Sequence, residues 1–242
     1  MAHDLLQRYI LGSGNPVFRS PSYKRGRQIA RLQGRAFDMD MLRHACTLEL
    51  LTDHWPAINE VCVIGDGQTN FLSAALASGH FSRVISVNLV DVLLSDLQLI
   101  DALKSVSDAD VKVARTQAEL DAARFDGTQI ILVPANRASI LHDQEIDAFV
   151  NIASFQEMTP EIVHEYFEII ASNKAFLYCC NRELKILPGG ERLEFASWPW
   201  GSADIQLDDL CPWQHSYYVP RPPFRQRYDG STRHRIACFQ AN

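Results

Sequence analysis

The sequence lacks the marks of a zinc protein, a membrane protein and a secreted protein. None of its six cysteines forms a C-x-x-C pair, so the spacing offers no zinc site. No apolar run approaches the about 20 residues that a membrane span needs, so we expect no span. The first residues, MAHDLLQRYI, have no basic segment followed by an apolar one, and we expect no secretory signal. Cysteines inside apolar runs are typical of buried, reduced thiols, and we predict a cytoplasmic protein.

Further absences narrow the function. The formal net charge is -6, so nucleic acid is not an expected partner. The sequence has no G-x-S-x-G motif, which disfavours an α/β hydrolase. No cluster of metal ligands can be read, and we predict no metal. Residues 19–35 are a local exception to the acidic charge, with six basic residues and no acid. This stretch predicts either a solvated helix face or a patch for a phosphate or an acidic partner.

Apolar runs alternate with amphipathic segments through most of the chain. We expect strands over residues 61–65, 83–89, 111–114, 129–135, 146–154, 174–181 and 233–239. Helices are expected over residues 70–79, 90–106 and 159–173, and also within residues 22–54 with Gly34 as a break. Residues 1–20 show no clear period and predict a loose lead-in. Strands separated by helices indicate an α/β fold, with a parallel sheet between two layers of helices.

A glycine turn at residues 65–67 raises the question of a cofactor. The strand ends in Gly-Asp-Gly and a helix follows, so free backbone N–H groups face the crevice where such sheets bind ligands. The pattern is altered, because Thr69 stands where methyltransferases often have a third glycine and Val63 where they often have an acid. The turn is therefore either a cofactor loop with altered parts or only a tight connection between a strand and a helix.

The surroundings of this turn favour an adenosine cofactor without a pyrophosphate. The form G-x-G-x-x-G is absent, since residue 70 is Asn, and this disfavours a nicotinamide enzyme. Asn88 ends the next strand, where an acid often binds the ribose hydroxyls. Its amide can donate and accept hydrogen bonds but supplies no charge. S-adenosylmethionine fits these features better than a dinucleotide does.

The second half of the chain carries uncommon motifs in a fixed order. They are NIASFQEM (151–158), EYF (165–167), YCCNR (178–182), WPW (198–200), CPW (211–213), RPPF (221–224), YDG (228–230) and RHR (233–235). Over residues 60–242 this set resembles a bacterial family of sugar O-methyltransferases, whose members accompany polysaccharide and sugar-bearing natural-product pathways. The resemblance implies a class I S-adenosylmethionine-dependent methyltransferase, which is Rossmann-like with a mostly parallel seven-stranded sheet.

The resemblance also implies a cofactor site at the carboxyl ends of the strands. The residues it assigns are Gly65, Asp66, Gly67 and Asn70 to the methionine part, Asn88 and Leu89 to the ribose, Pro134, Ala135 and Asn136 to the adenine, and Asn151, Ala153 and Ser154 to the side of the transferred methyl.

Transfer of a methyl group to an alcohol needs alignment and a general base. Holding the nucleophile and the methyl in line at about 3 Å supplies much of the catalysis, and a base takes the hydroxyl proton. We predict Glu157 and His234 as the catalytic candidates. Each has a plainer interpretation, Glu157 as a helix-end carboxylate and His234 as a surface histidine between two arginines. Asp229 and His215 rank below them.

The segment after residue 182 is rich in Trp, Tyr, Pro and Arg, which suits a sugar or a nucleotide sugar. Aromatic faces can cover the C–H surface of a sugar, and arginines can bind a diphosphate by forked hydrogen bonds. The predicted substrate-binding residues are Trp200, Trp213, Tyr218, Arg221, Arg225 and Arg233. The alternative is a lid that is packed for stability only.

We therefore predict a single methyltransferase domain that methylates a sugar hydroxyl. It would comprise an N-terminal arm and helices (1–57), a cofactor-binding core (58–182) and an acceptor-covering segment with the last strand (183–242). Two alternatives stay open: a methyltransferase that acts on a non-sugar small molecule, and a noncatalytic scaffold that keeps the fold. A homodimer is compatible with the sequence, which does not fix the oligomeric state.

Overall fold

The computed structural model describes residues 2–55, 57–103, 110–201 and 203–239, which form a mixed sheet between helices. The sheet has eight strands in the order β3-β4-β2-β1-β5-β6-β12-β9. These are β1 (Glu60–Ile64), β2 (Arg83–Asn88), β3 (Val111–Val113), β4 (Ile130–Pro134), β5 (Ala148–Ile152), β6 (Phe176–Arg182), β9 (Asp204–Leu210) and β12 (Thr232–Cys238). The pairings from β3 to β6 are parallel, whereas β12 runs antiparallel to both β6 and β9. The predicted Rossmann-like fold is confirmed, and β9 is one edge strand beyond the seven expected.

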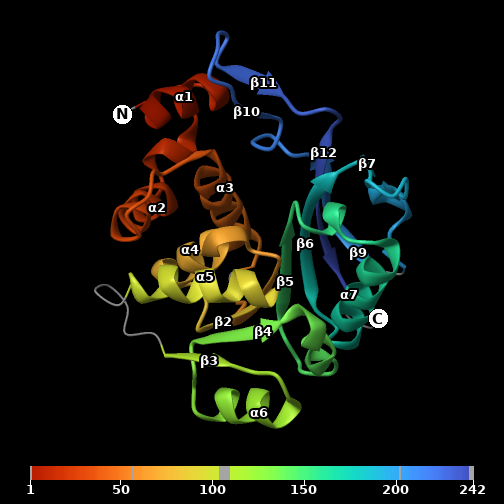
Figure 1. The fold of residues 1–242 in the computed structure, drawn as a ribbon. Coiled ribbons are helices and arrows are strands. Elements are labelled where there is room, and N and C mark those ends of the chain that lie inside the picture. Colours follow the sequence, from red (N-terminus) through yellow and green to blue (C-terminus); the bar gives the residue numbers. More distant parts are fainter. Residues whose placement is uncertain (1, 56, 104–109, 202, 240–242) are drawn as a thin grey trace.

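Helices cover both faces of this sheet (Figure 1). On one face lie α3 (Met39–His54), α4 (Asn70–Ser78) and α5 (Val90–Asp101), and on the other lie α6 (Gln117–Phe125) and α7 (Pro160–Ser172). Alternation along β1 shows why both faces are buried. Val61 and Val63 pack in the cluster that contains α3 and α4, while Cys62 and Ile64 pack in the cluster that contains α7.

The N-terminal residues are helical, and the prediction of a loose lead-in is wrong. Helix α1 (Ala2–Leu11) precedes a short turn and α2 (Pro21–Leu32). The buried Gln7 side chain donates to the carbonyls of Phe37 and Asp38, at 2.8 and 2.7 Å, and so ties α1 to the start of α3. The predicted break at Gly34 is confirmed, because this residue adopts a left-handed φ of +66° between α2 and α3.

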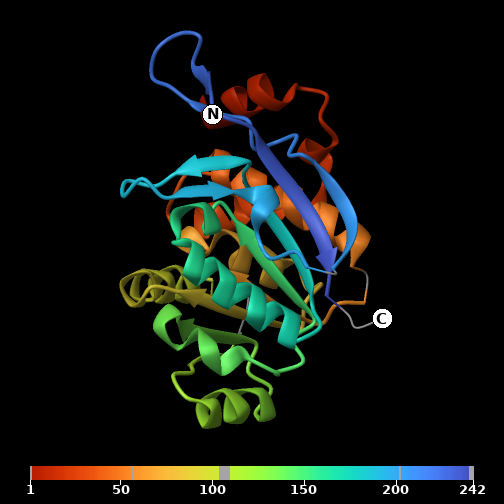
Figure 2. The same ribbon diagram turned by 90° about the vertical axis from the view of Figure 1, so that its right-hand side faces the viewer.

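The C-terminal residues form two hairpins and the last part of the sheet. One hairpin pairs β7 (Leu184–Ile186) with β8 (Arg192–Glu194), and the other pairs β10 (Ser216–Tyr218) with β11 (Arg225–Arg227). The second hairpin lies beside α1 (Figures 1 and 2), where the Arg225 guanidinium stands 5.4 Å from the centre of the Tyr9 ring. Helix α1 and the hairpin of β10 and β11 therefore meet above the carboxyl ends of the parallel strands.

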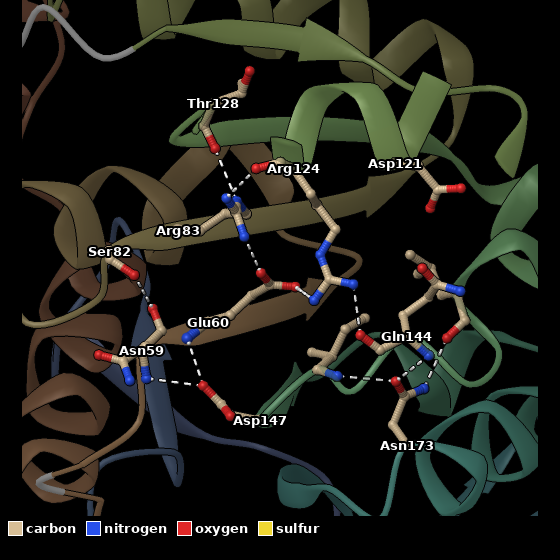
Figure 3. A network of polar contacts seen from close by, with 12 residues as sticks. Asn59, Glu60, Ser82, Arg83, Asp121, Arg124, Thr128, Gln144, Asp147 and Asn173 are labelled. Carbon is tan, nitrogen blue, oxygen red and sulfur yellow. Dashed lines mark hydrogen bonds and ion pairs between the residues drawn. The ribbon is translucent and has the colours of Figure 1, made fainter. Parts of the chain in front are cut away.

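A network of ion pairs lies at the amino ends of the parallel strands (Figure 3). Glu60 begins β1 and is buried, and its carboxylate accepts hydrogen bonds from Arg83 of β2 and Arg124 of α6. The backbone N–H of Glu60 donates to the Asp147 carboxylate at 2.9 Å. Side chains of the sheet and of α6 fill the space at the amino ends of these strands. A ligand can therefore bind at the opposite side, at the carboxyl ends of the strands.

Candidate active site

A cavity of about 470 Å³ opens at the carboxyl ends of β1, β5 and β6. Four segments form its wall: the start of α3, the glycine loop after β1, the turn after β5, and the C-terminal segment. Its lining residues are Asp38, Asp40, Arg43, His44, Gly65, Gly67, Gln68, Asn70, Ile152, Ala153, Ser154, Gln156, Arg182, Gln214, Tyr228 and Thr232. The lining includes hydrogen-bond donors, acceptors and charges of both signs, so the cavity suits a polar ligand.

Gly65 and Gly67 line this cavity for different reasons. Gly65 has a left-handed φ of +71°, and a Cβ on it would lie 2.4 Å from the Oγ of Ser154. Gly67 has no protein atom within 4 Å of a Cβ built on it, so its Cα faces open space. The first glycine therefore permits the turn and the close packing of β5, and the second leaves room for a ligand against the backbone.

Asp66 faces away from the cavity and into the protein. It is 2% exposed, and its carboxylate oxygens accept the backbone N–H groups of Phe71 and Leu72 at 3.0 and 2.7 Å. The carboxylate thus binds the free N–H groups at the start of α4. Burial raises the pKa of Asp66, and the nearby imidazole of His44 and these hydrogen bonds oppose the shift.

The end of β2 is also held by internal hydrogen bonds. The Asn88 side chain donates to the carbonyl of Asp66 at 3.1 Å and accepts the backbone N–H of Leu89 at 3.1 Å. It lies beside the fully buried Asp96 of α5, at 3.4 Å. Burial, and then the charge of Asp66, raise the pKa of Asp96 to about 7. Asn88 therefore links the end of β2 to the glycine loop.

A second hollow, of about 460 Å³, lies beyond the end of β2. Leu89, which is 66% exposed, lines it together with Ala135 and Asn136 from the turn after β4. Met158 and Tyr166 contribute the α7 side of the wall. Three of the residues predicted beside the ribose and adenine are thus brought together, while Pro134 ends β4 and is itself buried.

The turn after β5 brings Asn151, Ala153 and Ser154 against the glycine loop. Asn151 is fully buried and its amide donates to the carbonyl of Ile64 at 3.1 Å. The Ser154 hydroxyl donates to the same carbonyl at 2.9 Å. Ala153 adopts a left-handed φ of +59° and lines the cavity together with Ser154. This turn therefore forms the cavity wall next to Gly65.

Both predicted catalytic residues are engaged in contacts outside the cavity lining. The Glu157 side chain is 55% exposed and pairs with Lys185 at 3.1 Å. His234 is 4% exposed, lies 3.4 Å from the Tyr178 hydroxyl, and contacts the ring of Trp213 edge-on. Neither residue belongs to the described residues that line the cavity. Their contacts indicate a surface ion pair for Glu157 and a packing position for His234.

His44 of α3 is the imidazole that lines the cavity. Its side chain is largely buried, and its Nδ1 has no hydrogen-bond partner among the described residues. Burial lowers the pKa of His44, and the charges of Asp66 and Asp40 oppose this shift. The ring is therefore neutral near pH 7 and retains a nitrogen lone pair. Local sequence gave no signal for this residue, because only the packing of α3 brings it beside the glycine loop.

The predicted aromatic substrate residues lie in packed regions. Trp200 is 7% exposed, its indole N–H donates to the carbonyl of Phe195, and Arg235 stacks on its ring at 4.2 Å. Trp213 is half-buried and packs against His234. The side chain of Tyr218 lies outside the described residues. The two tryptophans that were expected to contact a sugar are thus packed against other side chains of the protein.

The predicted arginines are also placed outside the cavity. Arg233 pairs with Glu183 and Asp208, at 2.9 and 3.0 Å. Arg225 lies over Tyr9, and Arg221 is exposed at the tip of the second hairpin. Their placement indicates surface pairing for Arg233 and a contact between the second hairpin and α1 for Arg225.

A different arginine and a different aromatic residue, Arg182 and Tyr228, line the cavity. Both line the main cavity and a neighbouring hollow of about 640 Å³. The Arg182 guanidinium lies 5.5 Å from the centre of the Tyr228 ring, and no described acidic side chain pairs with it. Because Arg182 ends β6, the rule that ligands bind at the carboxyl ends of parallel strands was the signal that could have identified it.

The described residues contain neither a metal-binding cluster nor a helix that could span a membrane. No group of three or more His, Cys, Asp or Glu side chains is placed to hold a metal ion. Among the described helices, none is both long and apolar enough to cross a membrane.

Comparison with known proteins identifies the fold. No family profile and no curated protein matches the chain. The structure is similar to the methyltransferase domain of bacterial CtHen1-C, with a TM-score of 0.54 and 12% identity over 84% of this chain and 100% of that one. It is also similar to Thermoplasma acidophilum 1320, with a TM-score of 0.53 and 10% identity over 90% and 97% of the two chains. The chain therefore has the fold of a class I methyltransferase.

Proposed function

We propose that the protein is a methyltransferase that uses S-adenosylmethionine. The observation that carries the proposal is the cavity in which the open backbone of Gly67, the turn at Ala153 and Ser154, and the neutral His44 meet. The similarity in fold to the CtHen1 methyltransferase domain supports the same cofactor class.

The residues present fit this cofactor. Gly67 and Asn70 present backbone to the cavity that can bind its methionine part, and the space beside Gly67 would otherwise be filled by a side chain. Leu89 and Asn136 line a more apolar hollow that suits the adenine. When bound, the cofactor supplies a methyl group to a nucleophile in the cavity.

His44 is the residue that we propose as the general base. An alcohol gains nucleophilicity when its proton moves to a base in the transition state, and this typically accelerates a reaction by about 10²–10⁴-fold. His44 is the cavity residue with an uncharged imidazole, because burial lowers its pKa. In this assignment His44 accepts the acceptor's hydroxyl proton as the new O–CH₃ bond forms.

A sugar hydroxyl is the acceptor that the C-terminal motifs imply, and the cavity supports it. Asp38, Gln156, Gln214 and Thr232 offer both donors and acceptors, as a polyhydroxylated ligand requires. The Oε1 of Gln214 is buried without a hydrogen-bond partner among the described residues. The ring of Tyr228 adds a flat face for C–H groups.

The neighbouring hollow supports an acceptor that is larger than a single sugar. It meets the main cavity at Arg182 and Tyr228, and it also contains Arg227, Tyr217 and Asp229. Two guanidinium groups and two tyrosine rings suit the diphosphate and base of a nucleotide-linked sugar. Asp229 disfavours a ligand that carries many negative charges.

Titration calorimetry with S-adenosylhomocysteine tests the cofactor assignment. We expect a micromolar Kd for the wild type, which corresponds to about −8 kcal/mol. Gly67→Phe should abolish binding without unfolding the protein, because its side chain enters open space. Gly14→Phe is the matched control, since Gly14 also has open space around it but lies outside the cavity. A folded wild-type protein that does not bind would favour the noncatalytic scaffold.

An acceptor screen then tests the chemistry. It would use S-adenosylmethionine with nucleotide sugars, free sugars and glycosides, and detect the methylated product by mass. With the acceptor found, His44→Asn should slow turnover by at least about 100-fold while the Kd for S-adenosylhomocysteine changes little. Wild-type turnover in this variant would exclude His44 as the base, and methylation of phenols alone would exclude the sugar.

A further inference from the structure

The glycine loop holds two non-glycine residues in a left-handed conformation. Gln68 has φ 60° and ψ 31°, and Thr69, in the position of the missing third glycine, has φ 54° and ψ 28°. This region is unfavourable for any residue with a Cβ and most unfavourable for a β-branched one. Thr69 is also fully buried. Such a conformation persists only where neighbouring groups fix it.

Arg35, from the turn between α2 and α3, fixes the outer side of this loop. Its guanidinium donates to the side-chain and backbone oxygens of Gln68, at 2.9 and 3.1 Å, and to the side-chain oxygen of Asn70 at 2.8 Å. A planar guanidinium presents these donors in a fixed geometry. One side chain therefore binds the first residue of the left-handed pair and the residue that follows the pair.

Gln33 fixes the inner side of the same loop. Its amide nitrogen lies 3.4 Å from the Thr69 hydroxyl and donates to Ser73 of α4 at 3.2 Å and to the carbonyl of Leu99 at 3.1 Å. Its amide oxygen accepts the Nε–H of Arg35 at 2.8 Å. Gln33 and Arg35 thus form one connected brace.

Two backbone N–H groups at the start of α4 are satisfied without this brace. The Asp66 carboxylate already accepts the backbone N–H groups of Phe71 and Leu72. The brace acts instead on Gln68, Thr69 and Asn70. Gln68 and Asn70 line the cavity beside the open side of Gly67, and the buried Thr69 lies between them in the chain.

We infer that Gln33 and Arg35 are positioning residues for cofactor binding, and that they replace the missing third glycine. They hold the loop in the conformation that presents its backbone to the cavity, which a glycine would adopt unaided. This inference rests on the proposed function. It also assigns a role to one residue of the basic stretch 19–35 that the sequence did not suggest. Arg35 binds the loop, whereas Arg31 is exposed.

Calorimetry with S-adenosylhomocysteine on Arg35→Gln tests the inference. We expect the Kd to rise by about tenfold at a temperature well below unfolding, since hydrogen bonds from a charged group are lost. Arg31→Gln removes the same charge from the same stretch without touching the loop, and its Kd should stay within twofold of the wild type. Arg35→Lys should weaken binding as much as Arg35→Gln, because an ammonium cannot reproduce the fork.

Thr69→Gly separates positioning from general stabilisation. In the Arg35→Gln background it should return the Kd to within about threefold of the wild type, because glycine adopts the left-handed conformation without help. Binding by the wild type together with unchanged binding by Arg35→Gln overturns the inference and leaves the proposed function intact. Absence of rescue, or an Arg35→Gln protein that does not fold, also overturns it. No binding by the wild type rejects the proposed function itself.

Discussion

Substituting Gly65 by alanine tests how tightly β1 and β5 meet at the cavity. The backbone there has φ +71°, and an added Cβ would lie 2.4 Å from the Oγ and 2.5 Å from the Cβ of Ser154. Ser154 must then move from its hydrogen bond to the carbonyl of Ile64, which is 2.9 Å long. Gly67→Ala is the matched control, because its Cβ meets no atom within 4 Å and its φ lies outside the left-handed region.

Two contributions set the size of the effect. A left-handed conformation costs an L-residue about 1–2 kcal/mol, and loss of one hydrogen bond costs about 0.5–1.5 kcal/mol. We therefore expect Gly65→Ala to lower the free energy of unfolding by about 1.5–3.5 kcal/mol. For a chain of this length each kcal/mol lowers Tm by roughly 2–4 °C, so the fall should be roughly 3–14 °C. Gly67→Ala should stay within about 1 kcal/mol of the wild type.

Thermal unfolding followed by circular dichroism measures both variants, and a double-mutant cycle separates the two contributions. Ser154→Gly removes the atoms that an alanine at residue 65 would strike, so in this background Gly65→Ala should retain only the conformational cost. A Gly65→Ala protein with the wild-type Tm would refute the reasoning. So would an equal fall in Tm for Gly67→Ala.

Three further predictions concern buried ionisable groups. Glu60→Gln breaks the pairs with Arg83 and Arg124 and should lower the free energy of unfolding by about 3 kcal/mol in urea titrations; a loss below 0.5 kcal/mol would contradict this. Burial lowers the pKa of His44 below its usual 6.5, so stability should fall as pH drops below 6.5, and His44→Asn should lessen that fall. The pKa of Asp96 is raised to about 7, so its stabilising contribution is lost as pH rises from 4 to 7. Asp96→Asn should therefore raise the free energy of unfolding by roughly 1–3 kcal/mol at pH 8 and change it little at pH 4. Urea titrations at the two pH values measure this difference.

The sequence predicts the central sheet well because its strands are buried on both faces. The segment EVCVI of β1 is apolar after its first residue, and every residue is buried. β9 was missed because DIQLDDL is a polar, mostly exposed edge strand without that pattern. Helix α6 was also missed, although Thr116 and Glu119 form a capping box whose T-x-x-E spacing can be read in the sequence.

The sequence predicts the cavity less well, because its walls come from distant segments. Gly67 and Ala153 follow strands, so the rule for parallel sheets located both. His44 sits within a helix that is buried on most sides, and its distance from the loop depends on how α3 packs. The indole of Trp200 could cover a sugar, but a large apolar ring is equally suited to the core. In the structure it packs in the core against Phe195 and Phe167.

Helix α3 and the C-terminal segment 213–228 complete the cavity, and a single buried side chain joins them. Arg43 of α3 is 3% exposed and donates to the carbonyls of Trp213 and Ser216 and to the Tyr228 hydroxyl. It also pairs with Asp40 at 2.6 Å. A buried guanidinium with all these partners fixes their relative positions, because removing any one of them leaves a charge or a donor unsatisfied. The wall that carries His44 and the wall that carries Tyr228 are therefore positioned together, so the acceptor side of the cavity depends on the N-terminal helices as directly as the cofactor loop does.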